Sequence, residues 1–445
     1  MKRTIFAVVV TVLIASVLLV NPTAAMAETV LKLWTFPVDQ LYEEELPLLV
    51  KQFEEMNPGV KIEYEIIPWA EGQQKFDVAI NAGSPPDVFW GANDAKYIKT
   101  GLQIPLEDWL TADELADYEQ NSLEDMRIDG KIYSLPLYTL IWTLGGNQEL
   151  LEEAGIDWIS IQEQGWTFEE FAEITAKLTK ELPDGRTQYG FIMPGYNDEL
   201  LEFVLLGSGV YQMIGPDGNL LWTKEALTEA YTYIRELMDA GTLPREIAGM
   251  SAIKRWELFN SWDTAIFGRG IPYFESMSIT RNQDIADGKI AGKPISYISL
   301  PIPHKSGVRE VSYGASQGYA AFRQKRYQGD DHTALAVQLA KFLTGEYAGK
   351  TSVNLGYLPA SLSARGRSAH LMADLNPRNV AFTERQLTMT HSQYQEQISA
   401  DLDAKRARIR VEVSVPIYQA FIAYELTPEQ AATQFMERAT RILQR

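Results

Sequence analysis

Hydrophobic positions between residues 30 and 91 change their period several times, and the changes predict strand, helix, strand, helix and strand in that order. The apolar run 30–34 suits a buried strand, and residues 60–66 alternate apolar with charged side chains, as in a strand with one polar face. Helical spacing of apolar side chains is found at Leu46, Leu49, Val50 and Phe53. Pro47 is tolerated only in the first turn of a helix, so we expect this helix to begin near Leu46.

Strands that alternate with helices are joined by right-handed crossovers and form a parallel sheet. In such sheets ligands bind beyond the carboxyl ends of the strands. The corresponding positions here carry aromatic, amide and carboxylate side chains, namely Trp34, Phe36, Asn93 and Asp94. We therefore expect this edge of the sheet to face a ligand.

Two later helices are marked by their capping residues. Thr167 is followed by Glu170 at the spacing of a capping box, which predicts a helix start there. Thr427 precedes Pro428, which suits the first turn of a C-terminal helix. Further extended segments are predicted at residues 131–138, 264–267, 295–303 and 311–322. Because strand and helix alternate throughout, the predicted fold class is α/β.

The first 27 residues have the pattern of a secretory signal peptide. A basic start at Lys2 and Arg3 is followed by an apolar run at residues 5–20 and by a small-x-small motif that ends at Ala27. The apolar run is shorter than the roughly 20 residues that a membrane-spanning helix needs. We expect cleavage near Ala27 and a mature periplasmic or secreted chain of residues 28–445, with an uncleaved anchor as the alternative.

Composition excludes several kinds of partner and site. The net charge of −19 argues against nucleic acid or an anionic membrane as a partner. The chain has no cysteine, so an exported form must be stabilised by a large core instead of disulfides. Its four histidines lack metal-ligand spacing, and no phosphate-binding glycine-rich loop with a lysine is present, so we expect neither a metal nor a cofactor.

Short motifs recur in a fixed order across nearly the whole mature chain. They are LWTF at 33–36, NPGV at 57–60, AGSPPDV at 82–88, GKIY at 130–133, ELLEEAGI at 149–156, WTFEEF at 166–171, LPA at 358–360 and TPEQA at 427–431. In this order they resemble the family 1 extracellular solute-binding proteins of ABC importers, the maltose-binding-protein-like group. One departure is Gly145-Gly146-Asn147, where that family usually has an aromatic residue before the asparagine.

The resemblance implies a type 2 periplasmic-binding-protein fold, in which two α/β lobes are joined by three crossovers and close on a ligand in the cleft between them. It places one lobe at residues 28–138 plus 319–356 and the other at 139–318 plus 357–445. The crossovers are expected near residues 137–141, 313–318 and 356–358. Such a protein is expected to act as a monomer and to deliver its ligand to an ABC permease.

A sugar ligand needs aromatic platforms for its apolar faces and polar side chains for its hydroxyl groups. The chain has 10 Trp and 21 Tyr, and core packing is the alternative role of each. Arg269, between two glycines, could clamp a hydroxyl pair or a carboxylate, or lie on the surface. The predicted ligand contacts are Trp34, Phe36, Asn93, Asp94, Tyr138, Trp142, Arg269, Tyr273, Phe274, Tyr313, Ser316, Gln317 and Tyr357.

Residues 314–318 match the G-x-S-x-G pattern of a nucleophile elbow. A secreted serine hydrolase would use Ser316, with Asp330 or Asp331 and His332, His370 or His391 as downstream partners. The elbow requires a helix directly after the serine, but residues 319–322 continue as a strand pattern. We therefore interpret the segment as a glycine turn that presents Ser316 and Gln317 to a ligand, and the protein as a binding protein without enzymatic activity.

The predicted function is the capture of a carbohydrate, preferably an oligosaccharide, for an ABC importer. A binding protein for a peptide, a polyamine or a phosphodiester is the main alternative. The predicted strand ends lack a Lys/Arg cluster, which weighs against anionic ligands. The sequence names neither the sugar nor the permease.

Overall fold

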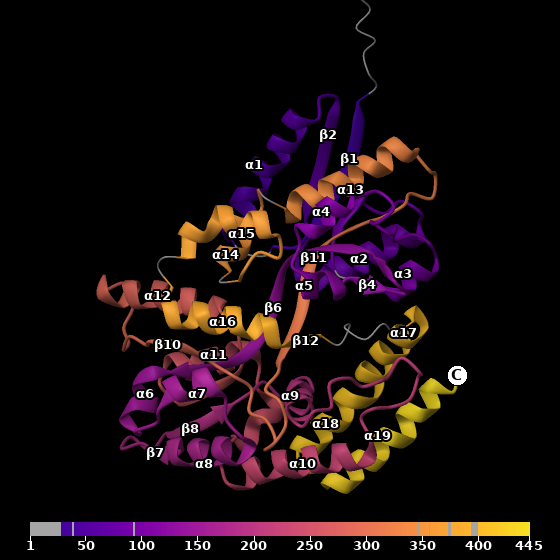
Figure 1. Cartoon of the computed structure of the whole chain (residues 1–445). Helices are drawn as coiled ribbons and strands as arrows, with labels where there is room; N and C mark the ends of the chain where they lie inside the picture. Colours follow the sequence, from indigo (N-terminus) through magenta and orange to yellow (C-terminus); the bar gives the residue numbers. More distant parts are fainter. Residues whose placement is uncertain are drawn as a thin grey trace, which may run out of the picture.

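The computed structural model describes residues 28–37, 40–91, 94–345, 347–355, 357–372, 375–392 and 399–445. The predicted leader, residues 1–27, lies outside them. Within the described ranges, no helix combines the length and the apolar character required to span a membrane. Figure 1 shows two lobes stacked one above the other, which confirms the expected α/β class and the two-lobe organisation.

The first lobe, at the top of Figure 1, contains a parallel sheet in which β1 (Thr29–Thr35) lies between β2 (Val60–Ile66) and β3 (Val88–Trp90). These strands and two helices, α1 (Gln40–Met56) and α2 (Trp69–Asn81), form the predicted strand–helix unit. The other elements of this lobe are α3 (Ala95–Lys99), α4 (Ala112–Ala116), α5 (Gln120–Glu124), β4 (Arg127–Ile128), β5 (Lys131–Ile132), α13 (Asp330–Thr344), α14 (Gly349–Asn354), α15 (Leu362–Ser368) and the 3₁₀-helix η2 (Ala369–Met372).

Helix α1 begins six residues before the predicted start at Leu46 and contains Pro47 in its interior. The prediction was wrong because Pro47 lies on the solvent-exposed side of the helix. Water can there satisfy the carbonyl that loses its intrahelical partner, and the buried side chains of Tyr42 and Leu46 hold the preceding turn in place.

The second lobe contains β9 (Thr264–Gly270), which pairs in parallel with β8 (Thr187–Ile192). Its other elements are α6 (Gln148–Glu153), α7 (Trp158–Gln164), α8 (Phe168–Leu178), β7 (Lys180–Glu181), α9 (Glu199–Gly207), α10 (Lys224–Asp239), the 3₁₀-helix η1 (Arg245–Gly249), α11 (Ala252–Asn260), α12 (Tyr273–Ala286), β10 (Tyr297–Leu300), α17 (Ala400–Ile409), the π-helix η3 (Arg410–Ser414), α18 (Val415–Ile422) and α19 (Pro428–Leu443). The predicted capping box at Thr167 is formed, and Thr427 caps the C-terminal helix as predicted, with a further capping box to Gln430.

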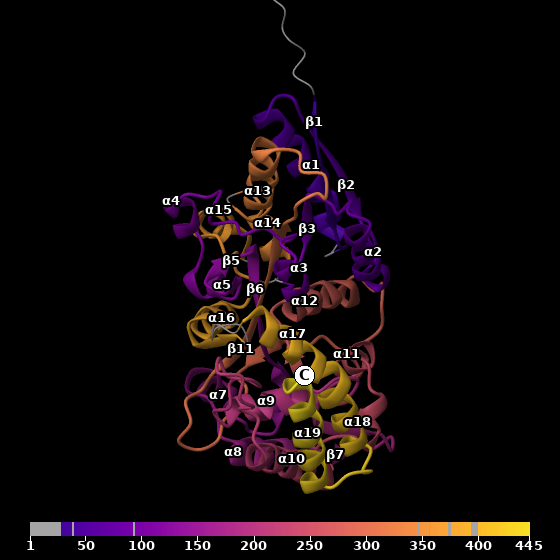
Figure 2. The same ribbon diagram turned by 90° about the vertical axis from the view of Figure 1, so that its right-hand side faces the viewer.

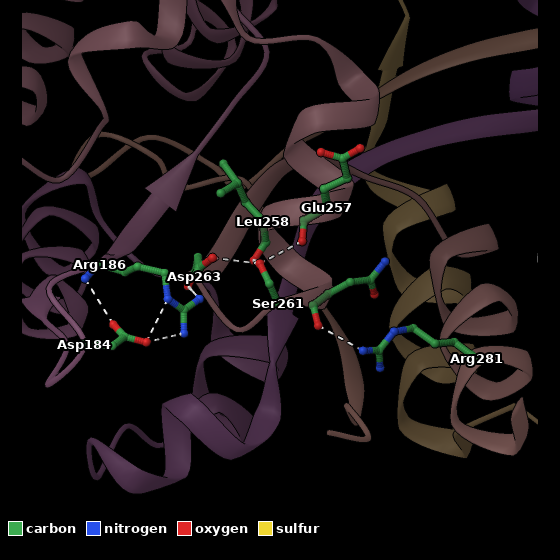
Figure 3. A network of polar contacts seen from close by, with 8 residues as sticks. Asp184, Arg186, Glu257, Leu258, Ser261, Asp263 and Arg281 are labelled. Carbon is green, nitrogen blue, oxygen red and sulfur yellow. Dashed lines mark hydrogen bonds and ion pairs between the residues drawn. The ribbon is translucent and has the colours of Figure 1, made fainter. Parts of the chain in front are cut away.

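The turn from α11 into β9 is held by the polar network shown in Figure 3. The Ser261 hydroxyl donates to Asp263 over 2.8 Å, and Asp263 also pairs with Arg186. Arg281 donates to the carbonyl oxygen of Asn260 over 2.9 Å. This network fixes the start of the strand whose far end carries Arg269.

Two long strands run through both lobes, β6 (Ser134–Asn147) and β11 (Ser312–Ala321). At one end, residues 319–321 of β11 pair with β3 of the first lobe. At the other end, residues 143–146 of β6 pair with β9 of the second lobe. Between these ends β6 and β11 pair with each other, so one continuous sheet in the order β2-β1-β3-β11-β6-β9-β8-β7 links the lobes.

The predicted crossovers near residues 137–141 and 313–318 fall within this shared part of β6 and β11. The third includes Gly356, which lies outside the described residues, while Pro359 forms an isolated bridge with Tyr138. The segment that follows contacts both lobes. Ser361 donates to Asp117, at the end of α4, over 2.6 Å. Helix α16 (Pro377–Met389) packs against β6, β10 and β11, and β12 (Thr390–Ser392) pairs with β11. The exact lobe limits therefore stay a prediction.

Gly145, where the resemblance led us to expect an aromatic residue nearby, lies in a filled part of the core. A Cβ atom at this position would lie 2.5 Å from Cζ of Phe267 and 2.7 Å from Cε2 of Tyr297. Real Cβ atoms do not approach other atoms so closely, because cores are packed at crystal-like density. Glycine thus allows Phe267 and Tyr297 to fill the space beside β6.

Candidate functional site

The shared part of β6 and β11 has two faces with different surroundings. Successive side chains of a strand point to opposite sides, and the register pairs Tyr313 with Trp142, Ala315 with Leu140, and Gln317 with Tyr138. We call the side that carries these six residues the floor face, and the other side the back face. Leu140, Ala315 and Gln317 are partly exposed, so the middle of the floor face is accessible to solvent.

The first-lobe end of the floor face is aromatic. The Tyr138 ring stacks on Tyr357 with 4.8 Å between ring centroids, and Trp90 lies 6.0 Å from Tyr138. The Trp90 ring also contacts the ring of Tyr319, and the Tyr319 hydroxyl hydrogen-bonds to the hydroxyl of Tyr42. Burial raises the pKa of Tyr357 well above its ordinary value, and its hydroxyl has no hydrogen-bond partner among the described residues. This end therefore holds one buried hydroxyl that is still available.

The second-lobe end carries a second stacked pair and a cation. Trp142 stacks on Tyr313 with 4.5 Å between ring centroids, and the Arg269 guanidinium lies 4.7 Å from the Trp142 ring centroid. Arg269 also pairs with Glu199 over 3.1 Å and donates to the hydroxyl of Tyr196 over 2.8 Å. The guanidinium is thus fixed at the edge of the floor face by three contacts of different kinds.

The backbone at Arg269 is strained. Its φ of 58° lies in the left-handed region, which is unfavourable for residues other than glycine. Arg255, which is buried, donates to the carbonyl oxygens of Gly268 over 2.7 Å and of Arg269 over 3.1 Å. Strain of this kind persists where the surroundings enforce it and is frequent at binding sites. Arg255 is therefore a positioning residue for Arg269.

Helix α9 begins with buried carboxyl groups. Arg410 pairs with Glu202 over 2.9 Å and with Asp198 over 3.3 Å. Burial raises the pKa of Glu199, and Arg269 opposes the shift. Burial also raises the pKa of Glu202 to about 8, although Arg410 acts to lower it. The Glu202 carboxyl is therefore easier to protonate than an exposed glutamate, and its protonated form can donate a hydrogen bond as well as accept one.

The back face is closed by α5 and α16, and Ser316 points to it. The Ser316 hydroxyl donates to a carboxylate oxygen of Asp125 over 2.8 Å and lies 2.9 Å from the hydroxyl of Thr139. Residues 314–318 are part of strand β11, which continues to Ala321, so the glycine turn that we expected is not formed. Without a helix directly after the serine, the segment is not a nucleophile elbow. His332 bonds instead to Asp87 over 2.8 Å.

The other predicted contacts fall into three groups. Seven lie on or beside the floor face, namely Tyr138, Trp142, Arg269, Tyr273, Tyr313, Gln317 and Tyr357. Tyr273 begins α12 and packs against the first-lobe core, so it reaches across between the lobes. Phe36 and Phe274 are buried in the cores, where Phe36 packs on Phe89 and Phe274 on Trp256.

The remaining predictions concern the ends of β1 and β3. Trp34 is half-buried, and the Lys75 ammonium lies 4.7 Å from its ring centroid. Asp94 is half-buried and directly precedes α3, and its carbonyl oxygen accepts from the backbone N–H of Tyr97 over 3.0 Å. Asn93 lies outside the described residues. Trp34 is therefore capped by a lysine side chain and contributes less open ring surface than the floor-face pairs do.

Sequence reasoning missed Tyr196, Glu199, Glu202 and Arg410. A signal was present, because Glu199 and Glu202 interrupt the otherwise apolar helix sequence ELLEFVLLG and all its residues are buried. Charged side chains in a buried helix require partners. No group of three or more His, Cys, Asp or Glu residues in the described ranges could hold a metal ion.

Comparison with known proteins gives consistent matches. Residues 41–350 match the family described as bacterial extracellular solute-binding protein. A protein of Brucella abortus (strain 2308), whose name describes it only as a candidate binding protein, is 24% identical over 319 residues, which is 70% of this chain and 71% of that protein.

Two solved structures show the shared fold. An ABC substrate-binding protein from Listeria monocytogenes in complex with cycloalternan gives a TM-score of 0.72 at 17% identity, covering 93% of this chain and 98% of that one. The maltose/maltodextrin-binding domain from Bdellovibrio bacteriovorus bound to maltotriose gives a TM-score of 0.67 at 19% identity, covering 94% of this chain and 100% of that one. The arrangement of two α/β lobes is therefore common to all three.

Proposed function

Because the chain belongs to the family of bacterial extracellular solute-binding proteins, we propose that it captures a carbohydrate for an ABC importer. The carbohydrate, preferably an oligosaccharide, binds over the floor face between the lobes. The lobes then close, and the membrane permease receives the ligand from the closed form. The protein acts as a periplasmic monomer after cleavage of the leader near Ala27, and it does no chemistry on its ligand.

The observation that carries this proposal is the make-up of the floor face. Solvent-accessible Leu140, Ala315 and Gln317 lie between two stacked aromatic pairs, one at each end. A sugar ring has flat apolar C–H faces and a polar rim, so it suits an apolar floor bordered by aromatic rings and by a few polar groups. The Gln317 amide and the Arg269 guanidinium are well placed to form hydrogen bonds with the hydroxyl groups of the sugar.

The buried Tyr357 hydroxyl supports the same ligand class. It has no partner among the described residues, and such groups cost free energy unless a ligand or water satisfies them. A sugar hydroxyl is both donor and acceptor, so it can bond with either role of the phenol. The names of the two solved relatives, with cycloalternan and maltotriose, point in the same direction.

For closure we propose that the lobes comprise residues 28–138 plus 319–356 and 139–318 plus 357–445, except that residues 357–372, which pack on α14 and Tyr138, move with the first lobe. Bending takes place in the shared part of β6 and β11. The chain has no cysteine, so single cysteines can be introduced for labelling. Leu48 in α1 and Ile253 in α11 are 67% and 74% exposed, one in each lobe. Spin labels at L48C and I253C should report a change in mean distance when ligand is added, and an unchanged distance would contradict closure.

The ligand class is tested by a thermal-shift screen of residues 28–445 against a broad carbohydrate panel. At about 100 times the dissociation constant, binding should add roughly 2.7 kcal/mol to the free energy of unfolding. Peptides, polyamines and phosphodiesters form the comparison panel. Stabilisation by one of these, with none by any sugar, would replace the carbohydrate proposal with the alternative solute.

Enzymatic activity is tested separately with chromogenic esters. We expect no hydrolysis, because the Ser316 hydroxyl is bonded to Asp125 on the back face. Ester hydrolysis that disappears in Ser316→Ala would show that the protein is a hydrolase.

A further inference from the structure

A cavity of about 260 Å³ lies in the second lobe beside the floor face. Tyr313 belongs to both, because it stacks on Trp142 and also lines the cavity. Two further aromatic side chains, Tyr211 and Trp222, line it as well. An oligosaccharide that covers the Trp142 end of the floor face can therefore continue past Tyr313 into the cavity.

The polar lining of the cavity comes from α9 on one side and from α17 and η3 on the other. Glu202 projects from α9, Arg406 from α17, and Arg410 from η3. Figure 1 shows α17 along the right-hand side of the second lobe. η3 is a π-helical segment, and π-helical turns within α-helices are frequent at functional sites. The irregular turn begins at Arg410, the residue that pairs with Glu202 over 2.9 Å.

The charges around the cavity are already matched. The charge of Arg410 is matched by Asp198, and that of Arg406 by Asp403. An anionic ligand would meet two guanidinium groups whose charges are already neutralised by these carboxylates. A cationic ligand would lie beside both arginines. The lining therefore favours an uncharged polar molecule, for which the arginines and Glu202 supply hydrogen bonds.

The size of the cavity sets a limit on the ligand. Sites for drug-sized ligands typically occupy about 300 to 1,000 Å³, so a cavity somewhat below this range suits a molecule of the size of one sugar ring. Tyr211, Trp222 and Tyr313 offer aromatic surface for its apolar face, and Glu202, Arg406 and Arg410 supply the polar groups. This combination is the one that a pyranose ring requires.

We propose that the cavity between α9 and α17 binds one uncharged sugar unit, at the end or at a branch of the oligosaccharide whose other units lie on the floor face. This inference rests on the proposed carbohydrate function and adds to it the path that the bound oligosaccharide follows, from the floor face into the cavity. An oligosaccharide that reaches the cavity binds more tightly than the same glycan without its last unit.

The test blocks the cavity from an exposed position. Ala407 lines the cavity on the exposed side of α17, so Ala407→Trp places an indole ring in it without replacing a core residue. Ala404→Trp is the matched control, because Ala404 is also exposed on α17 but does not line the cavity. Val411→Trp gives a second blocked form, since Val411 lines the cavity and is 71% exposed.

Wild type and the three variants are applied to a glycan array of neutral, uronic and amino-sugar oligosaccharides, and the dissociation constants of the hits are measured by calorimetry. We expect neutral oligosaccharides as hits, a loss of at least tenfold in affinity for Ala407→Trp or Val411→Trp, and less than twofold for Ala404→Trp. The glycan shortened by one unit should bind wild type and Ala407→Trp equally.

The failures are distinguishable. If wild type binds oligosaccharides and both blocked forms bind them equally well, the cavity is not a sugar site while the carbohydrate function stands. Hits confined to uronic acids or amino sugars would overturn the neutral-ligand assignment. If wild type binds no glycan on the array, the proposed function and this inference both fall.

Discussion

The two ends of the floor face use the same stacked aromatic pair in different surroundings. At the first-lobe end, Tyr138 and Tyr357 join a buried aromatic cluster whose polar groups are hydroxyls. At the second-lobe end, Trp142 and Tyr313 lie beside Arg269 and the ion pairs of α9. Packing, which does not depend on pH, stabilises the first-lobe end, whereas buried ion pairs stabilise the second-lobe end. Adaptation to a ligand is therefore expected mainly at the second end.

The largest effect is expected from breaking the Arg269–Glu199 pair. Glu199 is only 2% exposed, so Arg269→Met leaves a buried carboxyl without its cation. Breaking a buried pair costs about 3 kcal/mol of unfolding free energy, at the lower end of the measured range because Arg269 is partly exposed. Urea denaturation at pH 7 measures the loss, with Arg378→Met as the control for an exposed pair.

A double variant separates charge from packing in this prediction. If the loss comes from the uncompensated carboxyl, Arg269→Met combined with Glu199→Gln should regain at least half of the stability. A double variant that is as unstable as Arg269→Met would show that the contact with Trp142 is what matters.

The second effect concerns pH. The pKa of Glu202 is about 8 in the folded protein, above its ordinary value of 4.5, so the folded state keeps a proton that the unfolded chain releases near pH 4.5. The stabilisation from this proton is complete below pH 4.5 and is lost as the pH rises towards 8. Each pKa unit corresponds to about 1.4 kcal/mol, so a loss of roughly 2 to 3 kcal/mol is expected between pH 5.5 and 8.5.

Glu202→Gln is the corresponding test, because glutamine cannot release a proton. Its unfolding free energy should vary less than that of wild type across the same pH range. The surrounding charges, Asp198, Glu199, Arg406 and Arg410, are unchanged in this variant. Parallel curves for the two proteins would show that Glu202 is ionised in the folded state and that the second-lobe end carries more net charge than inferred.

A smaller effect is expected at the first-lobe end. Tyr357→Phe removes a buried hydroxyl that has no partner in the described structure, so the free energy of unfolding should change by less than about 0.5 kcal/mol, with a gain as the expected sign. Affinity for the carbohydrate should fall severalfold if the hydroxyl bonds to the ligand. Equal affinity would restrict the polar contacts to the second-lobe end.

Sequence patterns predicted well what depends on near neighbours. The strand at residues 60–66 and the capped helix starts at Thr167 and Thr427 have the predicted limits, because alternation and capping are local. The site was only partly predictable. Ser316 faces the back of the sheet, and this follows from pairing with β6, which is distant in sequence.

Arg410 and Glu202 show the same limit more strongly, since 208 residues separate them. Glu202 lies in α9 and Arg410 in η3, and nothing local in the sequence indicates that these two segments meet. The predicted start of helix α1 near Leu46 was wrong for the opposite reason. The rule against proline inside a helix is local. Helix α1 tolerates Pro47 because this residue is exposed to solvent, and only the tertiary structure determines that exposure.

The smallest effect is expected where the two lobes meet away from the floor face. Lys99 in α3 pairs with Asp401 in α17 over 2.8 Å, and both side chains are about half exposed. Such pairs contribute roughly 0.2 to 1 kcal/mol and are screened by salt. Lys99→Ala should therefore weaken carbohydrate binding by less than about fivefold in 20 mM salt and by nothing measurable in 500 mM salt, because closure loses one contact. A loss that is equal at both salt concentrations would assign Lys99 a role other than this ion pair.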